Sequence, residues 1–396
     1  MDRAPHGTPL YVHLPFCAAK CHYCDFFSVP SEGRDVDGAI EAVLREAEER
    51  APHAPRTVFL GGGTPSLLSV RQLARLLDGL DALTGFRDSS RETTLESNPE
   101  SLDEEKARAA LDLGVTRFSI GFQSLDDGVL RLFGRVHDTA ASFSAYEGAR
   151  RAGARSVSID LIYATPGQSP AEWERDLRRV LALGPDHLSA YNLTYEEGTR
   201  FHLWLRQGKL EKLDEERELE CLAIAREVCA EHGLRAYEIS NHARPGHACR
   251  HNVNYWRNGP YLGLGPSAVS HVQHERAGNA RSIEAWGRGV RERGSALEWR
   301  ERLGAAERLA ETWWLGLRLA QGVDPRRARR TAGFEGADDP ALPVARELVR
   351  SGHLERRGAR FRLSARGLPL ADALAAKFFA AAPPAASQDA ARAGAC

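Results

Sequence analysis

The sequence predicts an α/β fold, a partial (β/α)6 barrel followed by a small helical, winged-helix-like domain. Short β-rich runs alternate about six times with longer amphipathic stretches, and this alternation calls for right-handed crossovers and a parallel sheet. Six such units are too few to close an eight-stranded barrel, so the sheet is expected to be open, as a partial barrel or a doubly wound sheet. The 396 residues suffice for two domains, or for one large domain with an appendage.

The expected elements follow one another in strand and helix pairs. The strands are short apolar or β-branched runs at 10–13, 57–60, 93–96, 117–121, 156–162 and 187–193. The helices are stretches whose leucines and alanines recur at helical spacing, at 35–50, 70–83, 103–113, 140–152 and 171–183. In either architecture, ligands gather at the carboxyl ends of the parallel strands.

The C-terminal part has its own pattern. It contains, in order, helices at 305–319, 324–331 and 343–351, two short strands about Gly358, and a final helix at 367–379. We therefore expect a barrel over 1–235, a connecting segment over 236–304, a C-terminal domain over 305–380 and a disordered tail over 381–396. Residues 320–380 carry twelve Lys and Arg against seven Asp and Glu. This balance could suit DNA phosphates, but no cluster of base-reading side chains accompanies it, so a docking or lid role is preferred.

Three cysteines stand close together just after the first expected strand. Cys17, Cys21 and Cys24 have the spacing CxxxCxxC within HLPFCAAKCHYCDFFS. Three thiolates on one tight loop can hold three irons of a cubane cluster and leave the fourth iron open to a substrate.

A zinc site and a disulfide both fit these cysteines less well. A structural zinc site needs a fourth ligand, for which only His13 and His22 lie nearby. A disulfide needs an oxidising compartment, and the first residues, MDRAPHG, show no apolar leader that would direct the chain to one. The remaining cysteines are scattered and are expected to be idle thiols: Cys221, Cys229, Cys249 and Cys396.

Composition excludes some classes of protein. The 53 Lys and Arg against 54 Asp and Glu give a formal charge of -1, which offers no general attraction to nucleic acid or to an anionic membrane. No apolar stretch approaches the roughly 20 residues that a membrane-spanning helix requires. We therefore expect a cytoplasmic protein.

The loops after later strands carry glycines and polar side chains. After the second strand comes GGGTPS, which leaves the backbone bare for a small polar ligand or simply makes a tight strand-to-helix turn. Other strand ends supply carboxylate, amide and guanidinium groups from Glu96, Gln123, Arg135 and Asp160. Together they indicate a pocket for a zwitterionic, ribose-bearing ligand.

These motifs in combination resemble those of the radical S-adenosylmethionine (SAM) superfamily, in particular its group of coproporphyrinogen III dehydrogenases and HemW haem chaperones. The similarity extends from Tyr11 to about Phe379 and rests on YVHLPFC, GGGTPS, SIGFQS, GRVHD and HNVNYW. It implies that Cys17, Cys21 and Cys24 ligate a [4Fe-4S] cluster whose open iron chelates SAM.

The resemblance also implies which residues bind SAM. They are Tyr11 and Tyr23 beside the cofactor, Gly62, Gly63 and Thr64 at its amino end, Glu96, Gln123, Arg135 and Asp160 at its carboxylate and ribose, and Thr194 and Val269 at its adenine or the second side of the pocket.

Two departures separate the chain from the coproporphyrinogen dehydrogenases. Those enzymes have a fourth cysteine in CxxxCxxCxC, whereas Asp25 and Phe26 follow Cys24 here. They also have a long N-terminal extension, whereas ten residues precede Tyr11. Both differences put decarboxylation of coproporphyrinogen in doubt.

The motif HNxxYW, formed by His251, Asn252, Tyr255 and Trp256, resembles the haem-associated motif of HemW proteins. A neutral imidazole is a good axial ligand of haem iron, and aromatic rings can flank a porphyrin. His251 is therefore the expected ligand, ahead of His247, Cys249 and His271. Taken without the resemblance, the motif favours Tyr255 and Trp256 in an apolar core and His251 capping a loop.

The resemblance thus implies a haem chaperone that carries a [4Fe-4S] cluster and SAM and passes haem to an acceptor haemoprotein, such as a respiratory oxidase or reductase. Peripheral membrane association would come through that acceptor, and the chain would act as a monomer or homodimer. The main alternative is oxygen-independent oxidation of coproporphyrinogen III. A DNA-binding regulator with an iron–sulfur sensor is a third possibility, and no nucleic-acid partner is expected.

Overall fold

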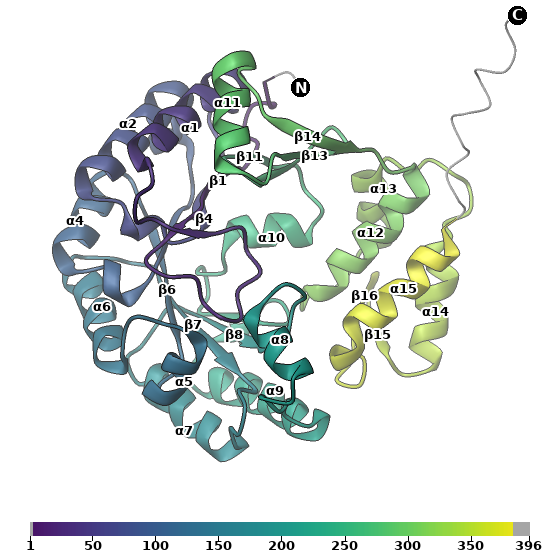
Figure 1. Ribbon diagram of the computed structural model, residues 1–396. Coiled ribbons are helices and arrows are strands. Elements are labelled where there is room, and N and C mark those ends of the chain that lie inside the picture. Colours follow the sequence, from purple (N-terminus) through teal and green to yellow (C-terminus); the bar gives the residue numbers. More distant parts are fainter. Residues whose placement is uncertain (1–2, 383–396) are drawn as a thin grey trace, which may run out of the picture. The chain divides into compact units, whose positions relative to one another are not determined.

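The computed structural model describes residues 3–382 (Figure 1). Of the disordered tail expected over 381–396, residues 383–396 lie outside the described residues, and the prediction starts too early because residue 381 is the last residue of a helix. The chain forms two compact units. The first comprises 3–251, 261–270 and 277–299, and the second comprises 252–260, 271–276 and 300–382.

The six predicted strands form the parallel centre of a nine-stranded sheet in the first unit. They are β1 (Leu10–Leu14), β4 (Val58–Gly62), β5 (Thr93–Ser97), β6 (Arg117–Gln123), β7 (Val157–Tyr163) and β8 (His187–Asn192), and they lie side by side in this order. Their side chains are largely buried on both faces, as is usual for a parallel sheet covered by helices. The predicted α/β fold with an open parallel barrel is confirmed.

Three further strands extend this sheet at its two edges. Strand β11 (Leu262–Leu264) pairs in parallel with β1. At the other edge, β10 (Asn241–Ala243) pairs antiparallel with β8 and with β9 (Arg235–Ala236). The expected end of the barrel at residue 235 is therefore too early, because part of the supposed connecting segment belongs to the sheet.

Helices line the outer side of the curved sheet (Figure 1). Those that follow the first five strands of its parallel centre include α1 (Val36–Arg50), α2 (Val70–Thr84), α4 (Glu104–Asp112), α6 (Thr139–Arg151) and α7 (Pro170–Leu181), as predicted. Each begins with an Asp or Ser whose side chain accepts a hydrogen bond from the backbone N–H three residues later. The remaining helices of this unit are α3 (Phe86–Ser89), α5 (Asp127–Phe133), α8 (Arg200–Arg206), α9 (Glu215–Glu231) and α11 (Ile283–Arg293).

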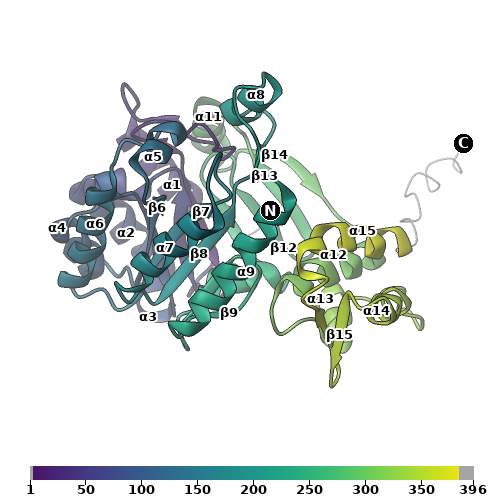
Figure 2. The same ribbon diagram turned by 90° about the horizontal axis from the view of Figure 1, so that it is seen from below.

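The functional end of the sheet is the one where the parallel strands finish. Figure 2 shows α5 and α8 at this end and α3 at the opposite end. The cysteine loop follows β1 at this end and lies between two short parallel strands, β2 (Phe16–Cys17) and β3 (Val29–Pro30). The loops after β1, β4, β5 and β6 therefore emerge together.

Some elements contain residues of both units. They are α10 (Arg250–Trp256) and the sheet of β12 (Val269–Val272), β13 (Glu275–Asn279) and β14 (Leu297–Glu301).

The second unit is built around a core of helices and one hairpin. It contains α12 (Ala305–Arg318), α13 (Pro325–Ala332), α14 (Ala341–Arg350), the antiparallel pair β15 (Leu354–Arg357) and β16 (Arg360–Leu363), and α15 (Ala371–Ala381). Trp313 is fully buried in the core, where its ring stacks on Phe378 at 5.3 Å and lies 5.6 Å from Phe361. The predicted order of three helices, hairpin and final helix is confirmed.

Candidate functional site

The three cysteines lie on one short loop held by backbone hydrogen bonds at its base. The N–H of Ser31 donates to the carbonyl of Cys17 at 2.9 Å. All three thiols are free and half-buried. Burial raises the pKa of Cys17, and it raises the pKa of Cys24 to about 11, with the neighbouring Cys21 adding to both shifts. A bound cation would reverse this and favour the thiolates.

The GGGTPS loop lies directly against the cysteine loop. The N–H groups of Gly63 and Thr64 donate to the carbonyls of Leu14 and Phe16 at 2.8 and 2.7 Å. A Cβ at Gly63 would lie 2.5 Å from the carbonyl oxygen of Phe16, so only glycine allows this approach. The Thr64 hydroxyl reaches the sulfur of Cys17 at 3.6 Å.

Gly62 is the second glycine that the site requires. Its φ is +103°, and a Cβ there would lie 2.5 Å from the His13 ring. Its N–H donates to Oε2 of Glu96 at 3.1 Å. The N–H groups of residues 62–64 are thus already used, and a ligand ammonium would have to be met by carbonyl oxygens of this loop.

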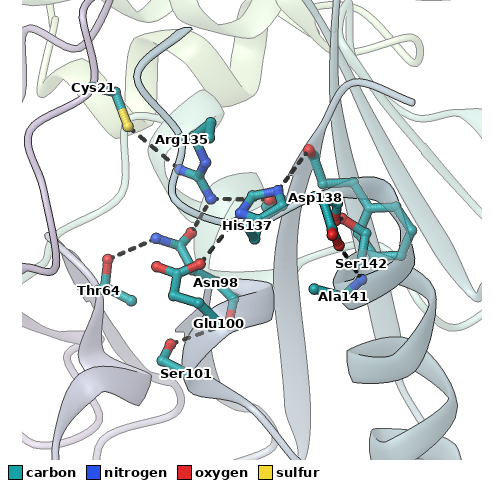
Figure 3. Close-up of polar contacts among 12 residues, drawn as sticks. Cys21, Thr64, Asn98, Glu100, Ser101, Arg135, His137, Asp138, Ala141 and Ser142 are labelled. Carbon is teal, nitrogen blue, oxygen red and sulfur yellow. Dashed lines mark hydrogen bonds and ion pairs between the residues drawn. The ribbon is translucent and has the colours of Figure 1, made fainter. Parts of the chain in front are cut away.

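A chain of hydrogen bonds connects Cys21 to Cys17 through Arg135, Asn98 and Thr64. Figure 3 shows the part of it from Cys21 to Thr64. The Arg135 guanidinium donates to the sulfur of Cys21 at 3.5 Å and to Oδ1 of Asn98 at 2.6 Å. The Asn98 amide donates to the Thr64 hydroxyl at 2.9 Å, and that hydroxyl donates to Cys17. The loops after β1, β4, β5 and α5 are therefore fixed to one another by side chains.

Glu100 and His137 form a second pair of side chains close to Asn98 and Arg135, as Figure 3 shows. Nδ1 of His137 lies 3.2 Å from Oε2 of Glu100, and its Nε2 lies 3.3 Å from the carbonyl oxygen of Phe122. Burial alone would raise the pKa of Glu100, but the bond to His137 and the charge of Arg135 lower it. The sequence did not single out Glu100 as a site residue, and its position in ESNPES is the one signal that could have done so.

Gln123 ends β6 in a left-handed conformation, with φ +66°, at an irregularity in the pairing with β7. A Cβ at Gly121 would lie 2.6 Å from Nε2 of Gln123 and 3.1 Å from Oδ1 of Asn98. The Gln123 side chain therefore turns back toward Asn98 and Arg135, as expected for a group that shares their ligand.

Asp160 is held by hydroxyl groups of three neighbouring strands. Its carboxylate accepts hydrogen bonds from Ser119 at 2.9 Å, Ser158 at 2.9 Å and Ser189 at 2.5 Å. Three donors on a carboxylate with about four acceptor positions leave little room for rotation and one position for a ligand hydroxyl.

Glu96 lies in a site that disfavours its charge. Burial raises the pKa of Glu96 to about 7, and the negative charge of Asp160 adds to this rise. The Gly62 N–H and the Arg117 guanidinium oppose it. A perturbed carboxyl at the ends of parallel strands is typical of a ligand site.

Tyr11 lies on β1, two residues before His13, and Tyr23 belongs to the cysteine loop itself, between Cys21 and Cys24. The Phe27 carbonyl oxygen can only accept, so Nε2 of neutral His13 donates to it at 2.8 Å, and the Tyr11 hydroxyl donates to Nδ1 of His13 at 2.9 Å. Burial lowers the pKa of His13, which keeps the ring neutral. Tyr23 packs edge-on against Phe133 at 4.8 Å.

Thr194 and Val269 remain predictions. Thr194 is exposed just after β8, and Val269 is half-buried in β12. Neither takes part in the hydrogen bonds that join Cys17 to Arg135.

His251 is enclosed by the first unit. Its side chain is 1% exposed, Nδ1 lies 2.8 Å from the Thr57 hydroxyl, and the ring lies 5.2 Å from Phe59. Burial lowers the pKa of His251 to about 3, so the imidazole is neutral. Haem ligation by His251 stays a prediction, and it would require the ring to leave this enclosure.

The aromatic residues of HNxxYW lie in the second unit. Tyr255 and Trp256 are half-buried, and the guanidinium of Arg318 lies 4.7 Å from the Trp256 ring centre. The motif is thus shared between the units.

Across residues 3–382, no three or more His, Cys, Asp or Glu side chains are grouped to hold a single metal ion. A cubane cluster does not need such a group, because each of its thiolates binds a different iron atom and the sulfur atoms can therefore lie further apart.

Comparison with known proteins places the chain in a family. The model of the radical SAM superfamily matches residues 11–180. The haem chaperone HemW of Synechocystis is 37% identical over 331 residues, which cover 80% of this chain and 79% of the relative. HemW of Bacillus subtilis is 32% identical over 86% of this chain and 91% of its own length, and HemW of Mycobacterium tuberculosis is 34% identical over 94% and 95%.

The chain belongs to the HemW family, within the radical SAM superfamily. The fold of this chain agrees with that of a solved coproporphyrinogen III oxidase, HemN of Escherichia coli, with a TM-score of 0.78 over 95% of this chain and 90% of the other at 24% identity. Membership in the superfamily implies a [4Fe-4S] cluster and SAM. The residues present fit both groups, because the chain has three free thiols on one loop and convergent carboxylate, amide and guanidinium groups beside them.

Proposed function

We propose that the chain is a haem chaperone, which binds haem and passes it to an acceptor haemoprotein. The observation that carries this proposal is the 32–37% identity to proteins named as haem chaperone HemW over most of their length. The residues after Cys24 agree, since Phe26 stands two positions beyond it, where the coproporphyrinogen dehydrogenases have their fourth cysteine.

Within this proposal, Cys17, Cys21 and Cys24 hold the cluster. When bound, the cluster and SAM supply one-electron reductive cleavage of the sulfonium. The carbonyl oxygens around Gly62 accept from the amino group of SAM, and the Arg135 guanidinium meets its carboxylate.

The other polar residues orient the rest of SAM. Asp160, fixed by its three serines, accepts from a ribose hydroxyl. Gln123 can donate or accept beside it. Glu96 was expected at the carboxylate and ribose, but its contact with the Gly62 N–H puts it beside the glycine loop, so once it has lost its proton we assign it to the amino group together with the loop carbonyls. Tyr11 and Tyr23, whose hydroxyl groups are buried, border the cofactor and help to exclude water from it.

Haem transfer is tested with purified protein, haem and an apo-acceptor such as a respiratory oxidase. We expect holo-acceptor to form faster from the haem-loaded chaperone than from the same concentration of free haem. Equal rates would contradict the proposal. Parallel runs with and without SAM and reductant show whether cleavage of SAM accompanies transfer.

The ligand is tested by haem titration of wild type, His251→Ala and His247→Ala, with absorption spectroscopy. Loss of affinity and a shifted Soret band in His251→Ala alone would support ligation by His251. An unchanged spectrum would reject it as the ligand and leave the cluster unaffected.

Oxygen-independent oxidation of coproporphyrinogen III is the second candidate, and its support is the shared fold with the Escherichia coli enzyme. Anaerobic incubation of reconstituted protein with SAM, reductant and coproporphyrinogen III discriminates the two. Formation of protoporphyrinogen and carbon dioxide would favour this candidate over the chaperone.

The place of action remains part of the proposal. None of the helices in residues 3–382 has the length and hydropathy to cross a membrane. We propose a cytoplasmic chaperone that meets membranes only through its acceptor.

A further inference from the structure

The second unit contains a small pocket that no part of the proposed SAM site uses. It lies beside the start of α13, and its wall includes Trp256, Arg257, Asp324, Arg327 and Arg360. The space inside is about 40 Å³. Since one water needs roughly 10–15 Å³ by this measure, the pocket has room for one small group and none for a whole porphyrin.

Three arginines meet at this pocket without a carboxylate partner. The guanidiniums of Arg257, Arg327 and Arg360 make no hydrogen bond or ion pair with any residue in 3–382. Other arginines of the unit differ, since Arg318 pairs with Asp372 at 2.8 Å and Arg362 pairs with Glu355 at 2.8 Å.

The arginines also repel one another. Partial burial lowers the pKa of Arg257, and the charges of Arg327 and Arg360 lower it further. Asp324 is the one acidic residue in the wall, and its Oδ1 accepts the N–H groups of Arg326 and Arg327 at 3.0 and 3.3 Å as the cap of α13. The wall of the pocket therefore carries three positive charges and one negative charge, and one oxygen of that carboxylate is already used to cap the helix.

Trp256 provides an independent sign of a missing partner. Its Nε1 is buried and has no hydrogen-bond partner within the described residues. A buried N–H without an acceptor costs about 1–3 kcal/mol. Guanidinium and indole groups are donors only, so the group that complements all of them is a negatively charged acceptor.

We propose that this pocket binds one oxyanionic group, a carboxylate or a phosphate, and that in the haem-loaded protein it takes a haem propionate. The second half rests on the proposed function, whereas the first half does not. The propionate is favoured as the source because Trp256 belongs to the HNxxYW motif and Arg257 follows it directly. A phosphate group of a free small molecule is the other source of the same chemistry.

The anion pocket is tested in the full chain by calorimetric titration with inorganic phosphate at low salt. We expect Arg327→Gln and Arg360→Gln each to weaken phosphate binding at least about fivefold, because each removes a charge-assisted donor. Arg330→Gln is the matched control, since it removes an exposed arginine of the same helix that is not part of the wall. Circular dichroism checks that all variants are folded. Equal phosphate affinity of wild type and Arg327→Gln would then overturn the proposal that this pocket binds an anion.

The source of the anion is tested with haem and haem dimethyl ester, which lacks the propionate charges. We expect Arg327→Gln to weaken haem binding and to leave binding of the ester unchanged. If phosphate binding depends on Arg327 but haem binding does not, the propionate assignment falls and a free phosphate compound is the ligand. If the wild type binds no haem, the proposed function fails while the phosphate titration still decides the pocket.

Discussion

At the scale of single residues, Glu96 is a buried carboxyl group whose surroundings favour its protonated form in the absence of a cationic ligand. Its carboxyl is buried near Asp160, and its pKa is about 7 against an ordinary value of 4.5. The proton that it holds near neutral pH can be given up when a cationic ligand group arrives. SAM binding should therefore release a proton when it is measured below about pH 7.

The raised pKa of Glu96 also predicts how stability depends on pH. Because the folded-state pKa exceeds the unfolded value, Glu96 lowers the free energy of unfolding progressively as pH rises from about 4.5 to 7, and no further above it. We expect Glu96→Gln to gain about 1–3 kcal/mol relative to wild type across this window. Urea unfolding of ligand-free protein at pH 5, 6, 7 and 8 measures it.

Glu105→Gln is the control for this experiment, since Glu105 is exposed on α4. The pH dependence of Glu96→Gln is read relative to that of Glu105→Gln. The same pH dependence for both variants would show that Glu96 is not buried near Asp160 as described.

The cysteines give the second prediction at this scale. Cys17→Ala, Cys21→Ala and Cys24→Ala should each lose most of the four irons and four sulfides that a reconstituted [4Fe-4S] cluster contributes. Cys229→Ala, which alters a buried thiol on α9, should keep them. Iron and sulfide analysis after anaerobic reconstitution decides the matter, and full iron in Cys21→Ala would remove Cys21 from the ligand set.

At the scale of elements, α10 depends on a carboxylate from another part of the first unit. Oε2 of Glu92 accepts the N–H of Arg250 at 3.0 Å, and Oε1 accepts the N–H of His251 at 3.1 Å. The thiol of Cys249 lies 3.4 Å from the same carboxylate. A negative charge at the start of a helix satisfies N–H groups that have no partner within the helix.

We therefore predict that Glu92→Gln weakens α10. The amide keeps one acceptor and places an NH2 group against donors, which should cost about 1–3 kcal/mol in the free energy of unfolding. Hydrogen exchange of 250–256 should accelerate most among all helices. Glu284→Gln, an exposed first-turn glutamate of α11, is the control and should leave this exchange unchanged.

The regular elements could be predicted well because each carries its own signal. The strands β1 and β4 to β8 are short runs rich in apolar and β-branched residues, and the helices between them start with clear caps. The edge strands β9, β10 and β11 were missed, since two or three residues such as Leu262–Leu264 show no periodicity. Their strand character comes from pairing with a formed sheet.

The candidate site could be predicted only in part for a similar reason. The spacing of Cys17, Cys21 and Cys24 is local, so the sequence shows it directly. The chain from Thr64 through Asn98 to Arg135 joins loops far apart in sequence and becomes visible only when the parallel strands bring their ends together. The burial of His251 likewise depends on its contacts with Thr57 and Phe59, which lie almost 200 residues earlier.

At the scale of the whole molecule, the candidate cluster site and the anion pocket lie in different units. The thiols and their hydrogen-bonded supports all belong to the first unit, and the arginine pocket belongs to the second. The HNxxYW motif is the piece of sequence that contributes to both, with His251 in the first unit and Trp256 in the second. We therefore expect the cluster to change hydrogen exchange in the first unit and an anion to change it in the second.

The final prediction concerns where cluster assembly orders the chain. Ligation of Cys17, Cys21 and Cys24 restrains the cysteine loop, and the bonds through Thr64, Asn98 and Arg135 pass that restraint to the loops after β4, β5 and α5. Hydrogen exchange of reconstituted against apo protein should therefore slow over 15–31, 61–68, 97–102 and 133–138. Residues 305–380 should exchange equally in both forms, whereas inorganic phosphate should protect 324–331 in the wild type but not in Arg327→Gln. Cluster-dependent protection that is as strong over 305–380 as over 15–31 would contradict the assignment of cluster and anion to separate units.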